Sequence, residues 1–349
     1  MQMSLAELEL LSRLCQDSVL VKIDRLIDWR AVSQLLKGLY KREKQDKGGQ
    51  QPYDSVVMFK AILLGQWHSL SDPELEEALR VRLDFIAFTR LPLSQLPDAT
   101  TLCRFRGRLV KAGKLQALLD EINRQLQQHQ LMVKKTQGAL LDATLITSAA
   151  RPKREITVAV DEGQQPVTYE DGSQPGTVDV SQSVDPDATW VKKGKKSHFG
   201  YRSYAVTDEE GFFVGAHTAP ANESEMNHFI PALEAVGIDA DRASRVLTDK
   251  GSASRKHREW LKARRLKCGI MHKAVKNQPL SARQKTANKL IAKRRYRVEQ
   301  FFGTLKRKFG FDRARYMTTA KVNAQMLLKG MCANLLKAAN KIQLEPQGA

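Results

Sequence analysis

The chain has 349 residues and a net charge of +19, and its 42% hydrophobic and 27% charged residues are ordinary for a globular protein. No apolar run approaches the ~20 residues that a membrane helix needs, so we expect no membrane association. The first residues interrupt their leucines with acids, and the four cysteines form no CxxC pair. These features argue against a secretory signal, a zinc site and a disulfide framework, and they favour a cytoplasmic protein.

The first part of the chain has the pattern of successive helices. Ser71 and Glu74 have the spacing of a capping box, which predicts a helix from there to about Ile86. Asp98 is the expected N-cap of the next helix, and Gly113 is its expected end. We therefore predict an all-helical N-terminal domain over residues 1–135.

Residues 71–112 have the length and pattern of two helices joined by a turn, as in a helix-turn-helix unit. The second of these helices carries three arginines that could enter a DNA groove, namely Arg104, Arg106 and Arg108. The alternative is a helical bundle with a basic outer face that forms an interface between subunits. The sequence favours neither interpretation over the other.

Near residue 138 the pattern changes to that of strands. The run GALLDATLITSA is short, apolar and rich in Leu, Ile and Thr, which predicts a strand. Residues 155–189 then hold eight acids and no Lys or Arg, which is typical of an acidic insertion outside the core. Residues 197–222 have two strand-like runs around DEEG and are predicted to form a β-hairpin.

Strands and helices alternate in the rest of the chain. Asn222 and Glu225 have the spacing of a capping box for a helix over residues 223–236. SRVLTDKG and KCGIMHK are predicted strands with a helix between them, and one long helix is expected from Ser281 to about Phe309. This order predicts an α/β fold, in which a mixed sheet with helices on both faces spans residues 136–321, followed by a C-terminal helix over 322–349.

Three acids stand out in the predicted sheet region. Asp142 lies inside an apolar strand, Asp249 ends another strand, and Glu299 lies on the long helix. Taken singly, a surface ion pair explains Glu299 and a turn explains Asp249. Three carboxylates brought together, however, need a counter-ion, and Mg²⁺ or Mn²⁺ prefers such oxygen ligands. We therefore expect a divalent metal site.

The acids are set in a strongly basic region. From Lys250 to Lys321 there are 23 lysines and arginines against three acids, so this stretch alone accounts for the net positive charge. Such a field favours binding to the phosphate backbone of nucleic acid. Arg295, Glu299 and Lys306 share one helical face. The remaining candidate phosphate contacts are Arg297, Arg307, Lys308, Lys192, Lys193, Lys195 and Lys196.

The motifs together resemble those of a known family. LLDATLI, VLTDKG and the spacing of Arg295, Glu299 and Lys306 are similar to the three motifs of bacterial insertion-sequence transposases of the DDE type, closest to the group named after insertion sequence five. The resemblance spans about residues 50 to 317. One departure is Ala292, where the family often has Tyr, three residues before Arg295.

The resemblance implies a ribonuclease-H-like catalytic domain that binds two Mg²⁺ or Mn²⁺ ions through Asp142, Asp249 and Glu299, with Arg295 and Lys306 on DNA. It implies an enzyme that binds the terminal inverted repeats of its element, hydrolyses phosphodiester bonds at the ends and joins the 3′-hydroxyls to target DNA. We expect double-stranded DNA as partner, at least a homodimer on DNA, no nucleotide cofactor and a place at the nucleoid. The alternatives are a ribonuclease-H-like nuclease without strand transfer and an inactive DNA-binding regulator.

Overall fold

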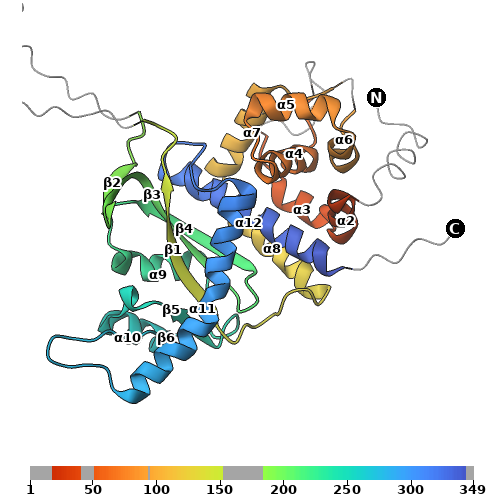
Figure 1. Ribbon diagram of the computed structural model, residues 1–349. Coiled ribbons are helices and arrows are strands. Elements are labelled where there is room, and N and C mark those ends of the chain that lie inside the picture. Colours follow the sequence, from red (N-terminus) through yellow and green to blue (C-terminus); the bar gives the residue numbers. More distant parts are fainter. Residues whose placement is uncertain (1–17, 41–50, 93–94, 152–183, 343–349) are drawn as a thin grey trace, which may run out of the picture.

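A computed structural model describes residues 18–40, 51–92, 95–151 and 184–342. Most of the predicted acidic insertion, 155–189, lies outside the described residues. Helices come first along the chain, followed by a sheet with its covering helices (Figure 1). The helices before the sheet are α2 (Val19–Leu26), α3 (Trp29–Leu36), α4 (Ser55–Trp67), α5 (Asp72–Val81), α6 (Leu83–Thr89), α7 (Ala99–Lys111) and α8 (Leu115–Gln128).

The predicted helix starts in this region are confirmed, but one predicted helix is two. The Ser71 hydroxyl accepts from the backbone N–H of Glu74 in a capping box at the start of α5, and Asp98 caps α7. The prediction of one helix to Ile86 is wrong, because α5 ends at Val81 and Arg82 is extended. The Arg82 guanidinium instead binds Asp84 in the first turn of α6, at 2.6 and 3.0 Å. Residues 71–112 therefore hold three helices and not two.

In the described residues the strands form one six-stranded mixed sheet, as predicted. β1 runs antiparallel to β3, and β3 runs antiparallel to both β2 and β4, which share its outer edge. On the other side β1 is parallel to β5, and β5 is parallel to β6. The strands are β1 (Ala139–Thr147), β2 (Thr189–Lys193), β3 (Lys196–Thr207), β4 (Phe213–Pro220), β5 (Arg245–Thr248) and β6 (Lys267–Ile270).

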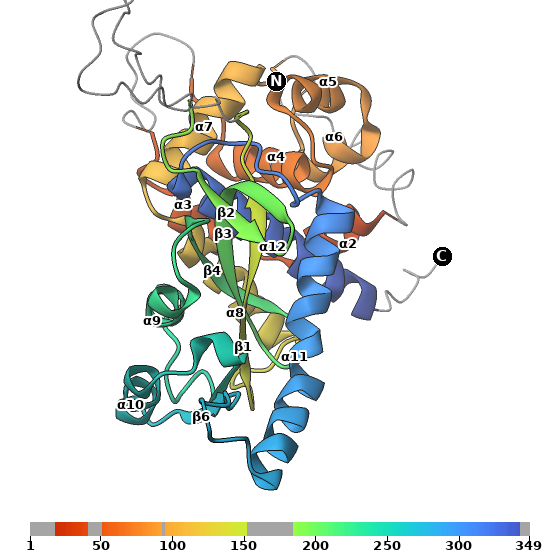
Figure 2. The same ribbon diagram turned by 60° about the vertical axis from the view of Figure 1, so that its left-hand side comes forward.

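Helices cover both faces of this sheet (Figure 2). One face packs against α11 (Ala282–Phe309) and α12 (Thr319–Lys341), and the other packs against α9 (Glu225–Ala235) and α10 (Arg255–Ala263). Successive side chains of a strand point to opposite faces. Leu140 accordingly belongs to the core beneath α11 and α12, whereas Leu141 belongs to the core beneath α9 and α10.

The N-terminal helices and the sheet are joined by a continuous core. α12 packs against β4 on one side and against α8, α4 and α2 on the other (Figure 1). One cluster of buried residues runs from α2 through α4 and α12 to β1 and β3. Among the described residues, no helix is long and apolar enough to cross a membrane.

The ends of the sheet helices are set by local side-chain chemistry. Ser281 caps α11 in a capping box with Gln284, so the long predicted helix is confirmed. The predicted cap of α9 is corrected, because the Ser224 side chain accepts from the N–H of Met226 and Asn222 bonds to Thr189 instead.

Candidate active site

The first predicted acid, Asp142, lies on the part of β1 that extends beyond its pairing with β5. β1 pairs with β5 only through Ala139 and Leu140, so Asp142 is beyond the last residue that pairs with β5. Its side chain faces α11, where Arg295 Nη2 lies 2.9 Å from Asp142 Oδ2. The two side chains are 22% and 13% exposed, so the ion pair is largely shielded from water.

The pKa of Asp142 depends on its burial and on four neighbouring residues. Burial raises the pKa of Asp142, and the negative charges of Asp249 and Glu299 raise it further. The Arg295 guanidinium opposes this rise and lowers the pKa of Asp142, as does the N–H of Ala143, which donates to Oδ1 at 2.9 Å. The charges of Asp249 and Glu299 therefore both act on the carboxylate of Asp142, although the three residues are far apart in the sequence.

The second acid, Asp249, follows directly after β5. It precedes the short 3₁₀ turn η1 (Lys250–Ser252), and its Oδ1 accepts from the N–H of Gly251 at 2.8 Å. Asp249 and Asp142 line one small pocket, together with Glu225 at the start of α9. The predicted strand with an acid at its carboxyl end is thus confirmed, and that end opens beside β1.

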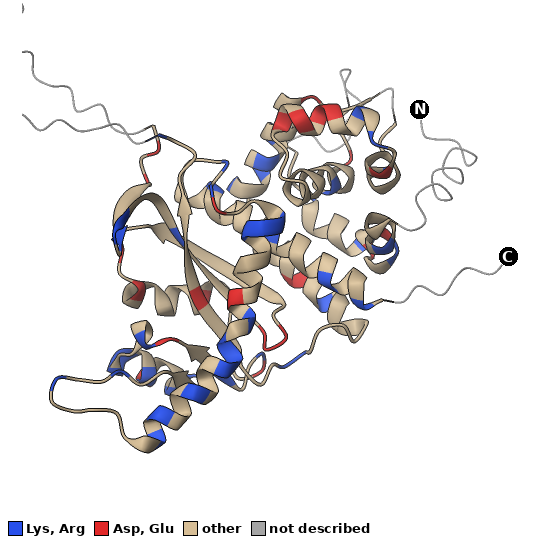
Figure 3. Ribbon diagram, in the orientation of Figure 1, with Lys and Arg blue, Asp and Glu red and all other residues tan. Residues whose placement is uncertain are grey.

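The third acid, Glu299, is exposed on α11. It is the only acid of α11, which otherwise carries lysines and arginines along much of its length, as the blue segments in Figure 3 show. α11 packs against both β1 and β5. In the described part of the chain, no three His, Cys, Asp or Glu side chains form a preassembled metal-binding group. One oxygen of Asp142 is instead bound to Arg295.

Lys306 lies two turns further along α11 and is half-buried. Its Nζ donates to the carbonyl oxygen of Leu145 on β1 at 3.3 Å. Burial lowers the pKa of Lys306, and the charge of Lys193 lowers it further. The β2–β3 hairpin, which carries Lys193, therefore approaches the C-terminal half of α11 and adds to its positive field.

The other predicted DNA contacts divide into exposed and buried groups. The exposed ones are Arg297, Arg307, Lys308, Lys192, Lys193, Lys195, Lys196, Arg104 and Arg108. Arg106 is different, because it is only 9% exposed and binds Asp72 through two hydrogen bonds of 2.5 and 2.8 Å. Its guanidinium also lies 4.2 Å from the centre of the Tyr316 ring. Arg106 thus fastens α7 to α5, which corrects its assignment as a groove-reading residue.

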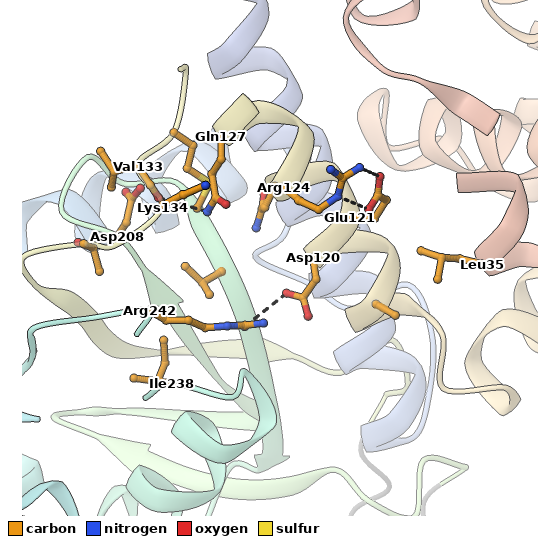
Figure 4. A pocket seen from close by; sticks show the side chains of 15 residues that line it. Leu35, Asp120, Glu121, Arg124, Gln127, Val133, Lys134, Asp208, Ile238 and Arg242 are labelled. Atoms are coloured by element: carbon orange, nitrogen blue, oxygen red, sulfur yellow. Dashed lines mark hydrogen bonds and ion pairs between the residues drawn. The ribbon is translucent and has the colours of Figure 1, made fainter. Parts of the chain in front are cut away.

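A separate cavity of about 420 Å³ lies between α8 and the sheet (Figure 4). Its charged side chains largely pair with one another, Arg242 with Asp120 at 3.8 Å and Arg124 with Glu121 at 2.6 Å. Asp208 also lines it, and its Oδ2 has no hydrogen-bond partner in the described residues. None of the three predicted acids lines this cavity. This cavity is therefore separate from the region that contains the three predicted acids.

The mixed sheet, with acids meeting at the open end between β1 and β5, defines a ribonuclease-H-like domain. The chain belongs to the transposase DDE domain family, which matches residues 134–335. A second family, described as a transposase domain (DUF772), matches residues 8–108.

One relative of known name indicates which kind of transposase the chain resembles. The chain is 40% identical over 239 residues to the transposase for insertion sequence element IS1106 of Neisseria meningitidis serogroup B. The match covers 68% of this chain and 78% of that protein. No solved structure matches the chain significantly. The chain is therefore similar to an insertion-sequence transposase, whereas the narrower group named after insertion sequence five stays a prediction.

Sequence reasoning did not identify two features of this site. It assigned Arg295 to DNA and not to Asp142, and it treated Glu225 only as a helix cap. The partners of both residues come from distant segments, so local patterns did not reveal them.

Proposed function

We propose that this transposase binds the ends of its insertion sequence, hydrolyses phosphodiester bonds there and joins the freed 3′-hydroxyls to target DNA. The observation that carries the proposal is that the charges of Asp249 and Glu299 both act on the carboxylate of Asp142, at the end of β1 that packs against the basic helix α11. Family membership supports the reaction class, and the geometry supports these three residues as its acids.

The acids have the chemistry of a divalent metal site. Carboxylate oxygens are the ligands that Mg²⁺ and Mn²⁺ prefer, and the raised pKa of Asp142 reflects a need for positive charge beside it. We propose that Asp142, Asp249 and Glu299 hold two such ions. When bound, two ions would activate the attacking oxygen and stabilise the leaving oxygen of a phosphoryl displacement. Arg295 supplies positive charge to the same carboxylate in this structure.

The bases of the chain then orient the DNA. Arg297, Arg307 and Lys308 are exposed along α11, and Lys193 of the β2–β3 hairpin is near enough to Lys306 to lower its pKa. We propose that these side chains hold the phosphate backbone on both sides of the scissile bond, with Lys306 closest to β1. α7 contributes Arg104 and Arg108 to end recognition, while Arg106 keeps that helix in place.

A joining assay tests this proposal. Purified protein is incubated with DNA from both flanks of its own gene and a supercoiled target, with and without Mg²⁺, beside Glu299→Gln. We expect metal-dependent joining of the flank 3′ ends to target, lost in the variant while DNA binding is kept. Cutting without joining would support a nuclease instead, and binding without either reaction would support a regulator.

A further inference from the structure

A fourth carboxylate stands at the same end of the sheet as the three predicted acids. Glu225 is the first residue of α9 and lines the pocket that also contains Asp142 and Asp249. That pocket has a volume of about 10 Å³, close to the space that one water molecule or one small ion occupies. The resemblance to transposases assigns no role to Glu225.

Glu225 and Asp249 both place carboxylate oxygens close to Gly251. A Cβ atom built on Gly251 would lie 3.2 Å from Glu225 Oε2 and 3.0 Å from Asp249 Oδ1. Since Gly251 has no side chain, the space between the two carboxylates stays open. Two negatively charged oxygens that face a small open space have the arrangement of ligands for a hard cation.

A second feature of the same pocket points to a missing polar partner. The side chain of Tyr204, a residue that is 3% exposed, lines the pocket. Burial raises the pKa of Tyr204 to about 12, and Arg202, which is within hydrogen-bonding reach of the hydroxyl, opposes this rise. No contact of that hydroxyl among the described residues has the full geometry of a hydrogen bond. Buried polar groups nearly always have a partner, and a metal-bound water in this pocket would provide one.

The two oxygens of Glu225 have different surroundings. Oε1 lies 3.3 Å from Arg202 Nη1 on β3, while Oε2 faces Gly251 and Asp249. The simpler interpretation is that Glu225 serves only as an ion-pair partner of Arg202 and as a favourable acid at a helix N-terminus. Neither role accounts for the position of Oε2, which lies close to Gly251, as Asp249 Oδ1 also does.

We propose that Glu225 is a fourth acid of the active site and holds a divalent cation together with Asp249. This inference rests on the proposed metal-dependent function. It predicts that metal affinity depends on Glu225 in the absence of DNA, and that the dependence does not pass through Arg202.

The test is a Mn²⁺ titration of the full chain without DNA, followed by the electron paramagnetic resonance signal of free Mn²⁺. We expect Glu225→Gln to weaken binding by at least about tenfold, the size of effect that loss of a supporting group at a metal site produces. Glu223→Gln is the matched control, because it removes the same charge two residues away, and it should leave the affinity unchanged.

Two further variants separate a ligand from a structural partner. Gly251→Ala keeps every charge but fills the open space, so it should weaken Mn²⁺ binding. Arg202→Gln frees Oε1 and removes a positive charge, so it should leave the affinity unchanged or raise it. If Glu225 were only a partner of Arg202, Arg202→Gln and Glu225→Gln would weaken binding equally. That result would overturn the inference.

The remaining outcomes separate this inference from the proposed function. If Asp249→Asn loses Mn²⁺ affinity and Glu225→Gln retains it, the inference is wrong and the metal site stands. If the unaltered chain binds no Mn²⁺ at millimolar concentration, both proposals fail. Circular dichroism of each variant checks that the fold is intact.

Discussion

The ion pair between Arg295 and Asp142 leads to a prediction about stability. Arg295→Met removes the guanidinium but keeps a side chain of similar length, and it leaves Asp142 without its cationic partner. With Asp142 22% exposed and Arg295 13% exposed, the pair is close to buried. Loss of one partner from a buried pair costs about 3–5 kcal/mol. Because Asp142 keeps some contact with water, we expect about 2–3 kcal/mol here.

Thermal unfolding measures this loss. At roughly 2 °C per kcal/mol for a chain of this size, Arg295→Met should unfold about 4–6 °C below the unaltered protein in metal-free buffer. Millimolar Mg²⁺ should restore much of this loss, because the ion replaces the missing positive charge beside Asp142. Arg297→Met is the control, since Arg297 is exposed on the same helix and its loss should change stability by under about 0.5 kcal/mol.

Two results would refute this reasoning. Equal stability of the Arg295 and Arg297 variants in metal-free buffer would mean that Asp142 does not need its partner. A Mg²⁺ effect no larger in Arg295→Met than in the unaltered protein would mean that the ion does not bind beside Asp142.

Three further predictions concern other parts of the molecule. Arg106→Met leaves Asp72 unpaired, so it should lower the free energy of unfolding, measured in urea, by about 2–4 kcal/mol. Arg104→Met is the control and should not destabilise the fold in this way. Equal effects of the two substitutions would contradict the role of Arg106 in holding α7 against α5. Burial raises the pKa of Asp208 to about 6, so the stability that its protonation contributes is present below about pH 4 and lost as pH rises through about 6. Asp208→Asn should therefore gain about 3 kcal/mol relative to the unaltered protein between pH 4 and pH 8, and a pH-independent difference would exclude this cause. The lysines of the β2–β3 hairpin are Lys192, Lys193, Lys195 and Lys196. Their replacement by Gln should weaken DNA binding equally for all sequences and should reduce the slope of log affinity against log salt concentration by about one unit per lost phosphate contact, as measured by fluorescence anisotropy. An unchanged slope would mean that these lysines do not contact the DNA.

The parts of the fold that depend on local chemistry were predictable from the sequence. The capping box at Ser71, the start of the long helix at Ser281, the cap at Asp98 and the hairpin after β3 all depend on residues a few positions apart. Asp249 was predictable for a related reason, because an apolar strand followed directly by an acid and a glycine is itself a local pattern.

Features that depend on distant partners were not predictable in this way. The burial of Arg106 depends on Asp72, which lies in another helix and which a run of exposed-looking charges does not reveal. Likewise, the Arg295–Asp142 pair joins a helix to a strand that is remote in the chain. In the sequence, an arginine beside a glutamate within a basic helix has the pattern of a phosphate contact, and only the packing of α11 on β1 shows its other partner.

The most direct test of the central claim is strand transfer from DNA ends that are already cut, which isolates the joining step. Asp142→Asn, Asp249→Asn and Glu299→Gln are each compared with the unaltered protein in Mg²⁺ and in Mn²⁺, with DNA affinity measured in parallel. We predict that each substitution abolishes joining while DNA affinity stays within a few-fold. Normal joining by any one of the three variants would contradict the assignment of these carboxylates as the catalytic acids.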